Sequence, residues 1–439
     1  WIHPEDSRLL YGGTDRGLYV SRDGGEHWGP MGGLPLGRFN HTSVDMEIPF
    51  NVYGGLERNG SWVGPASGWA ESGARNRNWM EFGSDDGFAI LVDPIEASRG
   101  YAVARSGELI RFNLQTGERK PIRPWAPDFA ELRFNRDAPI ALDPHDPEGI
   151  YYGSQFVHKS GNRGGTWQII SGDLTANDPA RRREDRRNAS DTDGFGTNAG
   201  TVDGPEVEGG ATITVIAPSP LDRDLIWVGT DEGDVQLTRS AGGEWESVRR
   251  RIRRVPDSSW VAHIEPSVFR PGSAYVAFDA HRTGNREPLI FWTDNYGRDW
   301  RNISGRSDIE GVVHTVEQDP IEEGLLFAGT EVGLYVSLNR GEDWFKWTHG
   351  LPPVPVHDLT LHPRDHDLVI ATHGRAAYVL DDIRPLRELA RNPRRNEFEL
   401  FLFEPPPAFI RGTPASDRDG PSAVDATPRG QDRPPGVLL

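Results

Sequence analysis

The segment LFAGTEVGLYVS at residues 326–337 occurs a second time, as LYGGTDRGLYVS, at residues 10–21. A third copy, IWVGTDEGDVQL, occupies residues 226–237. Each copy has an apolar run, a turn of the form Thr-acid-x-Gly and a second run in which apolar and polar residues alternate. Alternation with a period of two predicts β-strands, and a Gly-containing turn between two such runs predicts a hairpin. The chain is therefore built from a repeated β-hairpin.

A second motif follows the hairpin and ends in tryptophan. It reads Ser/Thr-x-Asp-x-Gly-x-x-Trp, and Asn or Ser replaces Asp in four of its five copies. The Asp or Asn side chain is expected to accept hydrogen bonds from amides of its own turn, Gly supplies a positive φ, and Trp fills the space between neighbouring sheets. Structural roles are therefore assigned to Asp23, Asn162, Ser240, Asn295 and Asn339, and to Trp28, Trp167, Trp245, Trp300 and Trp344.

The spacing of these tryptophans gives the length of the repeat. Successive ones lie 139, 78, 55 and 44 residues apart. The spacing of 78 becomes one repeat when a polar insertion at about 174–209 is removed, and the spacing of 139 holds two repeats whose turns have diverged. A period of about 40–50 residues with four strands per repeat is typical of a propeller blade.

Each repeat opens with a short apolar strand that ends near an acid–Pro or similar turn. Seven openers are present, at 41–45, 88–94, 139–144, 212–220, 261–266, 312–320 and 357–363. Residues 1–4 resemble the end of an eighth opener, and residues 398–403 are expected to supply the last outer strand. The sequence predicts an all-β fold over 1–403, a β-propeller of four-stranded antiparallel blades with seven complete repeats and one incomplete N-terminal repeat.

Composition excludes several classes of protein. The 51 glycines and 35 prolines indicate many short elements joined by tight turns. A net charge of −18 argues against nucleic-acid binding, and no apolar run is long enough to span a membrane. The chain has no cysteine, which excludes disulfides and a thiol nucleophile. Residues 1–4 do not read as a signal peptide, and 404–439 read as a Pro/Gly-rich tail or a linker to a further C-terminal domain.

The repeats and turns, with the segments at 51–62, 150–160, 274–282 and 372–375, carry a family resemblance. The chain resembles the bacterial Asp-box (BNR-repeat) propeller proteins labelled glycosyl-hydrolase-like or sortilin-type. The resemblance implies a propeller followed by a small β domain, and a secreted, periplasmic or cell-surface location. It leaves function open, because sialidases, xyloglucan hydrolases and sorting receptors share the Asp-box turn. The Arg-Ile-Pro strand of sialidases has no match here, so sialidase activity is not expected.

Functional residues are expected on one face of the ring. In a propeller the innermost strand of each blade lines the centre, and the loop into it shares a face with the loop between the second and third strands. Trp62 is added as a sugar-stacking aromatic and Arg133 as a clamp for a carboxylate or phosphate. The predicted binding residues are His41, Trp62, Arg133, Asn135, Trp260, His263, His314, His357, His373 and Arg375. A wide channel would keep the histidines apart, so no metal site and no cofactor are predicted.

Glycoside hydrolysis would need two carboxylates across a cleft, one with a raised pKa. Asp86, Asp85 and Glu265 are the first candidates, because acids such as Asp93 and Asp143 recur beside the Pro turns and are expected to cap them. Three hypotheses remain open: recognition of a glycan or peptide outside the cytoplasm, a glycoside hydrolase or lyase at the channel mouth, and a scaffold for protein assembly.

Overall fold

The computed structural model describes residues 1–14, 17–31, 36–68, 74, 78–83, 86–125, 132–176, 210–305, 308–392 and 402–403. Within these residues the single α-helix is α2 (Arg384–Arg391), and nearly all other regular structure is β-strand. No helix in this part of the chain is long and apolar enough to cross a membrane. The predicted all-β class is confirmed.

The strands form eight antiparallel sheets, each built from strands that are consecutive in the sequence. Seven of them are blades. Blade 1 holds β4 (Phe39–Val44), β5 (Asn51–Leu56), β6 (Ser61–Pro65) and β7 (Met80–Gly83); blade 2 holds β8 (Ile90–Val92), β9 (Arg99–Ala104), β10 (Glu108–Asn113) and β11 (Glu118–Pro121); blade 3 holds β12 (Ile140–Leu142), β13 (Ile150–Gly153), β14 (Val157–Ser160) and β15 (Gln168–Ile169).

The remaining blades follow the same order. Blade 4 holds β16 (Ile213–Pro218), β17 (Leu225–Thr230), β18 (Val235–Arg239) and β19 (Trp245–Ser247); blade 5 holds β20 (Trp260–Pro266), β21 (Ala274–Asp279), β22 (Leu289–Thr293) and β23 (Arg301–Asn302); blade 6 holds β24 (Val313–Gln318), β25 (Leu326–Thr330), β26 (Gly333–Ser337) and β27 (Phe345–Trp347); blade 7 holds β28 (Val356–Leu361), β29 (Leu368–Thr372) and β30 (Ala377–Leu380). The seven predicted openers are the first strands of these blades. The outer strand expected at 398–403 falls mostly outside the described residues; Leu402 and Phe403 are described and are not in a strand.

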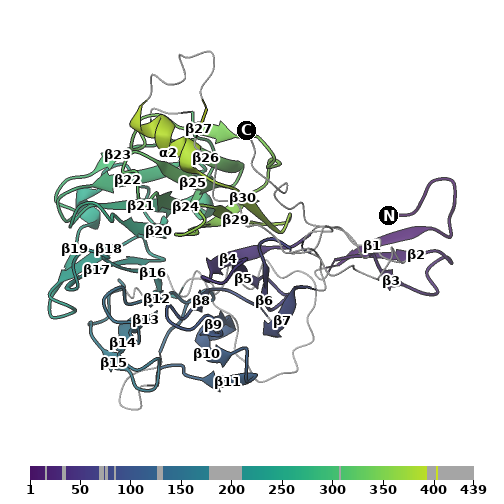
Figure 1. The fold of residues 1–439 in the computed structure, drawn as a ribbon, viewed down its shortest axis with the longest axis horizontal. Coiled ribbons are helices and arrows are strands. Elements are labelled where there is room, and N and C mark those ends of the chain that lie inside the picture. The colour runs from purple at the N-terminus through teal and green to yellow at the C-terminus, as the bar shows by residue number, and fades with distance from the viewer. Residues whose placement is uncertain are drawn as a thin grey trace.

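The first strands of the blades lie side by side around a centre, and blade 7 packs against blade 1 (Figure 1). The hydroxyls of Thr42 in β4 and Thr360 in β28 are 3.0 Å apart, and the amide of Thr42 donates to Asp358 at 2.8 Å. Directly after the ends of β28 and β4, Nε2 of His362 lies 2.8 Å from the carbonyl oxygen of Asp45. The seven blades therefore close into a ring.

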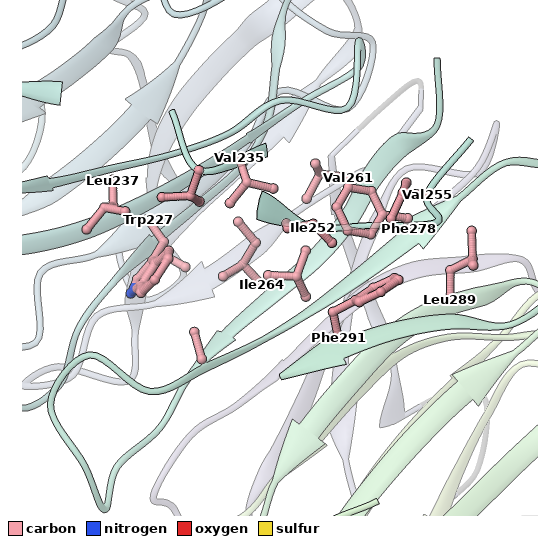
Figure 2. Packing of buried hydrophobic residues seen from close by; sticks show 14 of the residues in the cluster. Trp227, Val235, Leu237, Ile252, Val255, Val261, Ile264, Phe278, Leu289 and Phe291 are labelled. Atoms are coloured by element: carbon pink, nitrogen blue, oxygen red, sulfur yellow. The ribbon is translucent and has the colours of Figure 1, made fainter. Parts of the chain in front are cut away.

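Apolar side chains fill the space between neighbouring blades. Between blades 4 and 5, Trp227 and Leu237 face Ile264 and Phe291 (Figure 2). Burying one such aliphatic or Phe side chain stabilises the fold by roughly 1.5–3 kcal/mol. Small residues in the second strands permit the close approach: a Cβ on Gly229 would lie 2.3 Å from Cγ1 of Val261 in the next blade.

The five Trp-ended turns share one hydrogen-bond pattern. In the turn after β26, the hydroxyl of Ser337 accepts the amide of Gly341 at 2.8 Å, and Oδ1 of Asn339 accepts the amide of Asp343 at 2.9 Å. The other four turns repeat both bonds. The indoles of Trp167, Trp245 and Trp344 donate to a carbonyl of the preceding blade, whereas those of Trp28 and Trp300 donate within their own turns. These turns thus order the outer part of blades 3, 4, 5 and 6 and of the N-terminal sheet, and three of them also tie a blade to the preceding one.

The eighth sheet contains β1 (Leu10–Thr14), β2 (Gly17–Ser21) and β3 (Gly29–Pro30), and it projects from the ring (Figure 1). In the sequence repeat, β1 and β2 correspond to β25 and β26, which are the second and third strands of blade 6. Trp28 is 46% exposed, while the equivalent Trp344 is 2% exposed. This sheet is the incomplete N-terminal repeat that the sequence predicts.

Candidate functional site

The first strands of five blades contain the same irregularity in their pairing with the second strand. The register skips one residue in blades 1, 4, 5, 6 and 7, and the skipped residues are Asn40, Thr214, Ala262, His314 and His357. A β-bulge of this kind bends the strand and re-aims the side chain of the extra residue. All five bulges lie near the start of the strand, at the end of the ring that we call the upper face.

Two neighbouring bulges bring histidines into contact on the upper face. The rings of His314 and His357 lie 4.4 Å apart between centroids, and the ring of His373 lies 4.5 Å from that of His357. His373 reaches this place because it directly follows β29, whose end shares the upper face with the start of β28. Burial lowers the pKa of all three side chains, most strongly that of His357. At neutral pH these three rings are therefore uncharged; we call them the histidine row.

His41 is charged, unlike the histidine row. Its Nε2 lies 2.7 Å from Oδ2 of Asp137, and its Nδ1 lies 3.7 Å from Oδ2 of Asp358. Burial opposes the charged form, but the two carboxylates outweigh this effect and raise the pKa of His41 well above its ordinary value. The imidazolium therefore links blades 1 and 7 to the loop before blade 3. His263 has no such partner, and burial lowers its pKa to about 4.

Asp86, the preferred catalytic candidate, lies on the upper face, but its carboxylate is engaged by hydrogen bonds and ion pairs. It accepts the amide of Arg58 and forms ion pairs with Arg105 and, at 3.3 Å, Arg136. Burial would raise the pKa of Asp86, but these cationic and amide donors outweigh it, and the pKa is lowered. An ionised, buried carboxylate of this kind is unsuited to act as a general acid. Asp85, the other aspartate candidate, lies outside the described residues.

Glu265, unlike Asp86, has the raised pKa that a general acid needs. It lies on β20, the first strand of blade 5, and Glu317 lies on β24, the first strand of blade 6. Burial raises the pKa of Glu265 to about 8, and burial together with the charge of Glu265 raises that of Glu317 well above its ordinary value. The two carboxyl groups interact strongly enough that one of them holds a proton at neutral pH.

Arg133 and Asn135 lie in the contact between blades 3 and 4. The guanidinium of Arg133 donates to Oδ2 of Asp173 at 2.8 Å and to the hydroxyl of Thr175 at 3.1 Å. The amide of Asn135 donates to the hydroxyl of Thr212 at 2.9 Å. Both side chains therefore join neighbouring blades, and the structure does not bring them into contact with the histidine row.

The two aromatic candidates and Arg375 lie around the upper face. The indole of Trp62 donates to the carbonyl of Asn59 at 2.6 Å, and the guanidinium of Arg282 stacks 3.6 Å from the centre of the Trp260 ring. Arg375 is exposed, and its main-chain amide donates to the hydroxyl of Thr372. Trp62 and Trp260 are both half-buried.

Acids beside the Pro turns lie at the opposite end of the inner strands. Oδ1 of Asp93, Asp143 and Asp319 accepts the amide of the second residue after it, in each case at 2.9 Å. These bonds explain why the acids recur with the repeat. Among the described residues, the one group of acids and histidines close enough to share a metal ion is Asp23, Glu26 and His27, which is exposed on the projecting sheet.

The sequence predicts all five histidines, His41, His263, His314 and His357 at the start of inner strands and His373 in a turn between second and third strands, because these loops share one face of the ring. The bulges were missed because an extra residue does not change the hydrophobic pattern visibly over a six-residue strand. The charged partners Glu57, Asp137 and Arg136 were missed too, since they lie in loops that have no periodicity.

Fold and site together define this protein as a seven-bladed β-propeller with a polar cluster on the upper face of its ring. Its structure is similar to the GH74 enzyme of Niastella koreensis (15% identity, TM-score 0.52, 80% of this chain and 53% of that chain) and to the GH74 xyloglucanase of Xanthomonas campestris (16%, 0.52, 80% and 53%). An ancestral GH74 enzyme is similar as well (15%, 0.52, 79% and 45%). At this identity the likeness shows the fold alone, and the chain spans about half the length of these enzymes. No protein-family model and no curated protein matches the sequence.

Proposed function

We propose that the upper face of the ring binds a glycan chain. The histidine row carries this proposal. A neutral imidazole offers one N–H donor and one lone-pair acceptor, which suits sugar hydroxyls, and its flat ring suits the C–H faces of sugars. In the row, His314 and His357 would supply these groups, because Nε2 of His373 already accepts Nε–H of Arg38 and its Nδ1 is buried.

The fold supports the same ligand class. Solved structures of similar fold include a GH74 xyloglucanase and two other GH74 enzymes. The hydrogen-bond pattern of the five Trp-ended turns supports an Asp-box propeller. A polymeric glycan as ligand would place the protein outside the cytoplasm, in agreement with the family resemblance.

Binding without hydrolysis is favoured by the state of the acids on the upper face. Asp86 is ionised and held by arginines, and Asp137 and Asp358 are both engaged by His41. Asp86, whose pKa is lowered, lacks the raised pKa that a general acid needs, and the other two acids are occupied by the imidazolium of His41.

The test is a glycan array, followed by calorimetry with the best ligand on the wild type, His357→Ala and His27→Ala. His27 is an exposed histidine of the projecting sheet and serves as the matched control. We expect His357→Ala to weaken binding by roughly tenfold, because one or two hydrogen bonds and a stacking surface are lost. Equal affinity in the two variants, or binding of peptides and no glycan, would contradict the proposal.

A glycoside hydrolase is the second candidate, and Glu265 with Glu317 favours it. Two interacting carboxyl groups with different proton affinities are the usual arrangement of a general acid and its partner. A chromogenic-glycoside screen tests this function. Turnover that disappears in Glu265→Gln and persists in Asp86→Asn would establish it, while binding without turnover in the wild type would leave the protein as a recognition module.

A further inference from the structure

Arginines gather on the upper face beside the histidine row. The loop of Arg375 rests on the segment before β4, because the carbonyl of Gly37 accepts the amides of Gly374 and Ala376 at 2.9 and 3.0 Å. An isolated bridge between Arg38 and His373 continues this contact. Blades 1 and 7 thereby place two guanidinium-bearing residues at the same edge of the histidine row.

Arg38 is fixed in place by its neighbours. Its Nε donates to Nε2 of His373 at 2.6 Å, and its Nη2 lies 2.5 Å from Oε2 of Glu57. Nevertheless the Arg38 side chain is 45% exposed, whereas that of Glu57 is 13% exposed. The acid therefore lies beneath the guanidinium, which presents its remaining N–H groups toward solvent.

The same arrangement, an arginine above a more deeply buried acid, continues toward blade 2. Arg136 lies 3.2 Å from Glu57 and 3.3 Å from Asp86, and Arg105 pairs with Asp86. The Asp86 side chain is 1% exposed and that of Arg105 is 38% exposed. Three arginines contact the two less exposed acids Glu57 and Asp86, and Arg375 is exposed in the adjacent loop. With the charged His41, these cationic groups outnumber the acids of this part of the surface, Asp137 and Asp358 included, on a chain whose net charge is −18. Such a local reversal of sign attracts anions.

We propose that the glycan bound at the histidine row is acidic, and that Arg38 and Arg375 bind the carboxylate of a uronic acid unit. This inference rests on the proposed function, since it names the class of sugar that the same site takes. A guanidinium binds a carboxylate through two parallel N–H donors, which fixes orientation as well as charge. Next to it, the uncharged histidine row receives the hydroxyls of the sugar ring.

The experiment measures binding by calorimetry with galacturonate, glucuronate and mannuronate oligomers of three to six units. The same oligomers after methyl esterification, and neutral gluco-oligosaccharides of equal length, are the comparison ligands. We expect at least one acidic oligomer to bind tenfold or more tightly than its methyl ester, with an affinity that falls as salt is raised. If no acidic oligomer binds more tightly than its ester, the inference is overturned.

Variants separate the role of charge from that of folding. Arg375→Gln changes an exposed side chain, and we expect it to weaken binding of the acidic oligomer by about tenfold and to leave binding of the ester unchanged. Arg38→Gln should do the same more strongly, and Arg38→Lys should restore part of the affinity. Arg119→Gln, an exposed arginine on the outer strand of blade 2, is the matched control and should have no effect.

The outcomes distinguish this inference from the proposed function. Neutral and acidic oligomers that bind equally well, with wild-type affinity in Arg375→Gln, would overturn the inference while the glycan-binding proposal stands. The absence of binding to every glycan, charged or neutral, would overturn both.

Discussion

At the scale of single residues, the surroundings of a side chain set its charge, so residues of the same type differ in their protonation state. His41 is charged because two carboxylates face it, whereas burial keeps His263 and the histidine row neutral. The two acids Asp86 and Glu265 also differ in their protonation state. Asp86 is surrounded by arginines and stays ionised, while burial raises the pKa of Glu265 to about 8. Sequence predicts where such groups lie along a strand, but not which charges face them.

Glu265→Gln is predicted to change stability in a pH-dependent way. The folded-state pKa of about 8 lies above the ordinary 4.5, so ionisation is less favourable in the folded protein. The wild type therefore loses stability as the pH rises from about 4.5 to about 8. We expect the variant to match the wild type near pH 4.5 and to be more stable at pH 8.5, on the order of 1–2 kcal/mol.

Urea unfolding at both pH values measures this difference. Glu118→Gln serves as the control, because Glu118 is exposed on the outer strand of blade 2 and should show no such dependence. The interpretation is wrong if Glu265→Gln has the same effect on the free energy of unfolding at pH 4.5 and pH 8.5.

At the scale of elements, the recurring bulge and the recurring turn perform different tasks. The turn orders the outer part of the blades that contain it through bonds within eight residues, so its geometry follows from local sequence. The bulge lies near the start of the first strand, at His314 in blade 6 and His357 in blade 7. Its effect depends on the partner strand and on the neighbouring blade, and therefore becomes visible only in the assembled ring.

Ser337→Ala is predicted to destabilise the ring by about 1–2 kcal/mol. The buried hydroxyl accepts the amide of Gly341 and donates to Asn339, and its removal leaves a buried amide without a partner. Ser21→Ala removes the same bonds in the projecting sheet and is the matched control. A background with both Trp1→Phe and Trp28→Phe removes the tryptophans of the projecting sheet. Fluorescence-monitored unfolding in this background reports on the ring, and Ser21→Ala should leave that transition unchanged. Equal shifts in both variants would show that the two sheets unfold together.

At the scale of the whole molecule, the described residues form no sheet shared between blades 7 and 1; the ring closes through side chains and through the main-chain bonds from Gly374 and Ala376 to Gly37. The ring of His362 stacks on Phe50 at 4.2 Å between centroids, and its Nε2–H donates to the carbonyl of Asp45 at 2.8 Å. Nearby, Arg364 donates to the carbonyls of Met46 and Glu47, each at 2.7 Å. The same closure brings Arg38 to His373 on the upper face, so the candidate site exists only in the closed ring.

His362→Ala is predicted to cost about 2–4 kcal/mol, because a buried ring and two hydrogen bonds are lost. Hydrogen exchange should then show reduced protection first in β4 and β28. His158→Ala is a matched control, since His158 is equally buried but contacts Ser154 inside blade 3. Loss of protection spread evenly over all blades in His362→Ala would argue against a weak point at the closure.

The sequence by itself determined the blade. Alternation in the hairpins, the Trp-ended turns and the acid–Pro turns all arise from interactions between residues close in the chain. Their patterns can therefore be recognised in the sequence, although the Trp-ended turn occurs in five copies and not in every repeat. For this reason the all-β class, the seven openers and the incomplete first repeat could be predicted, together with the face on which most of the histidines lie.

Only the tertiary structure decided the site. Residues 38, 57, 86, 136 and 373 come from three blades and from the loops between them, and ring closure over more than 300 residues brings them together. Because charge depends on the distance between groups and on burial, the ionised Asp86, the protonated carboxyl of the Glu265–Glu317 pair and the positive arginine patch had no counterpart in local sequence. The same physical reason placed Arg133 between blades, where an ion pair with Asp173 holds it.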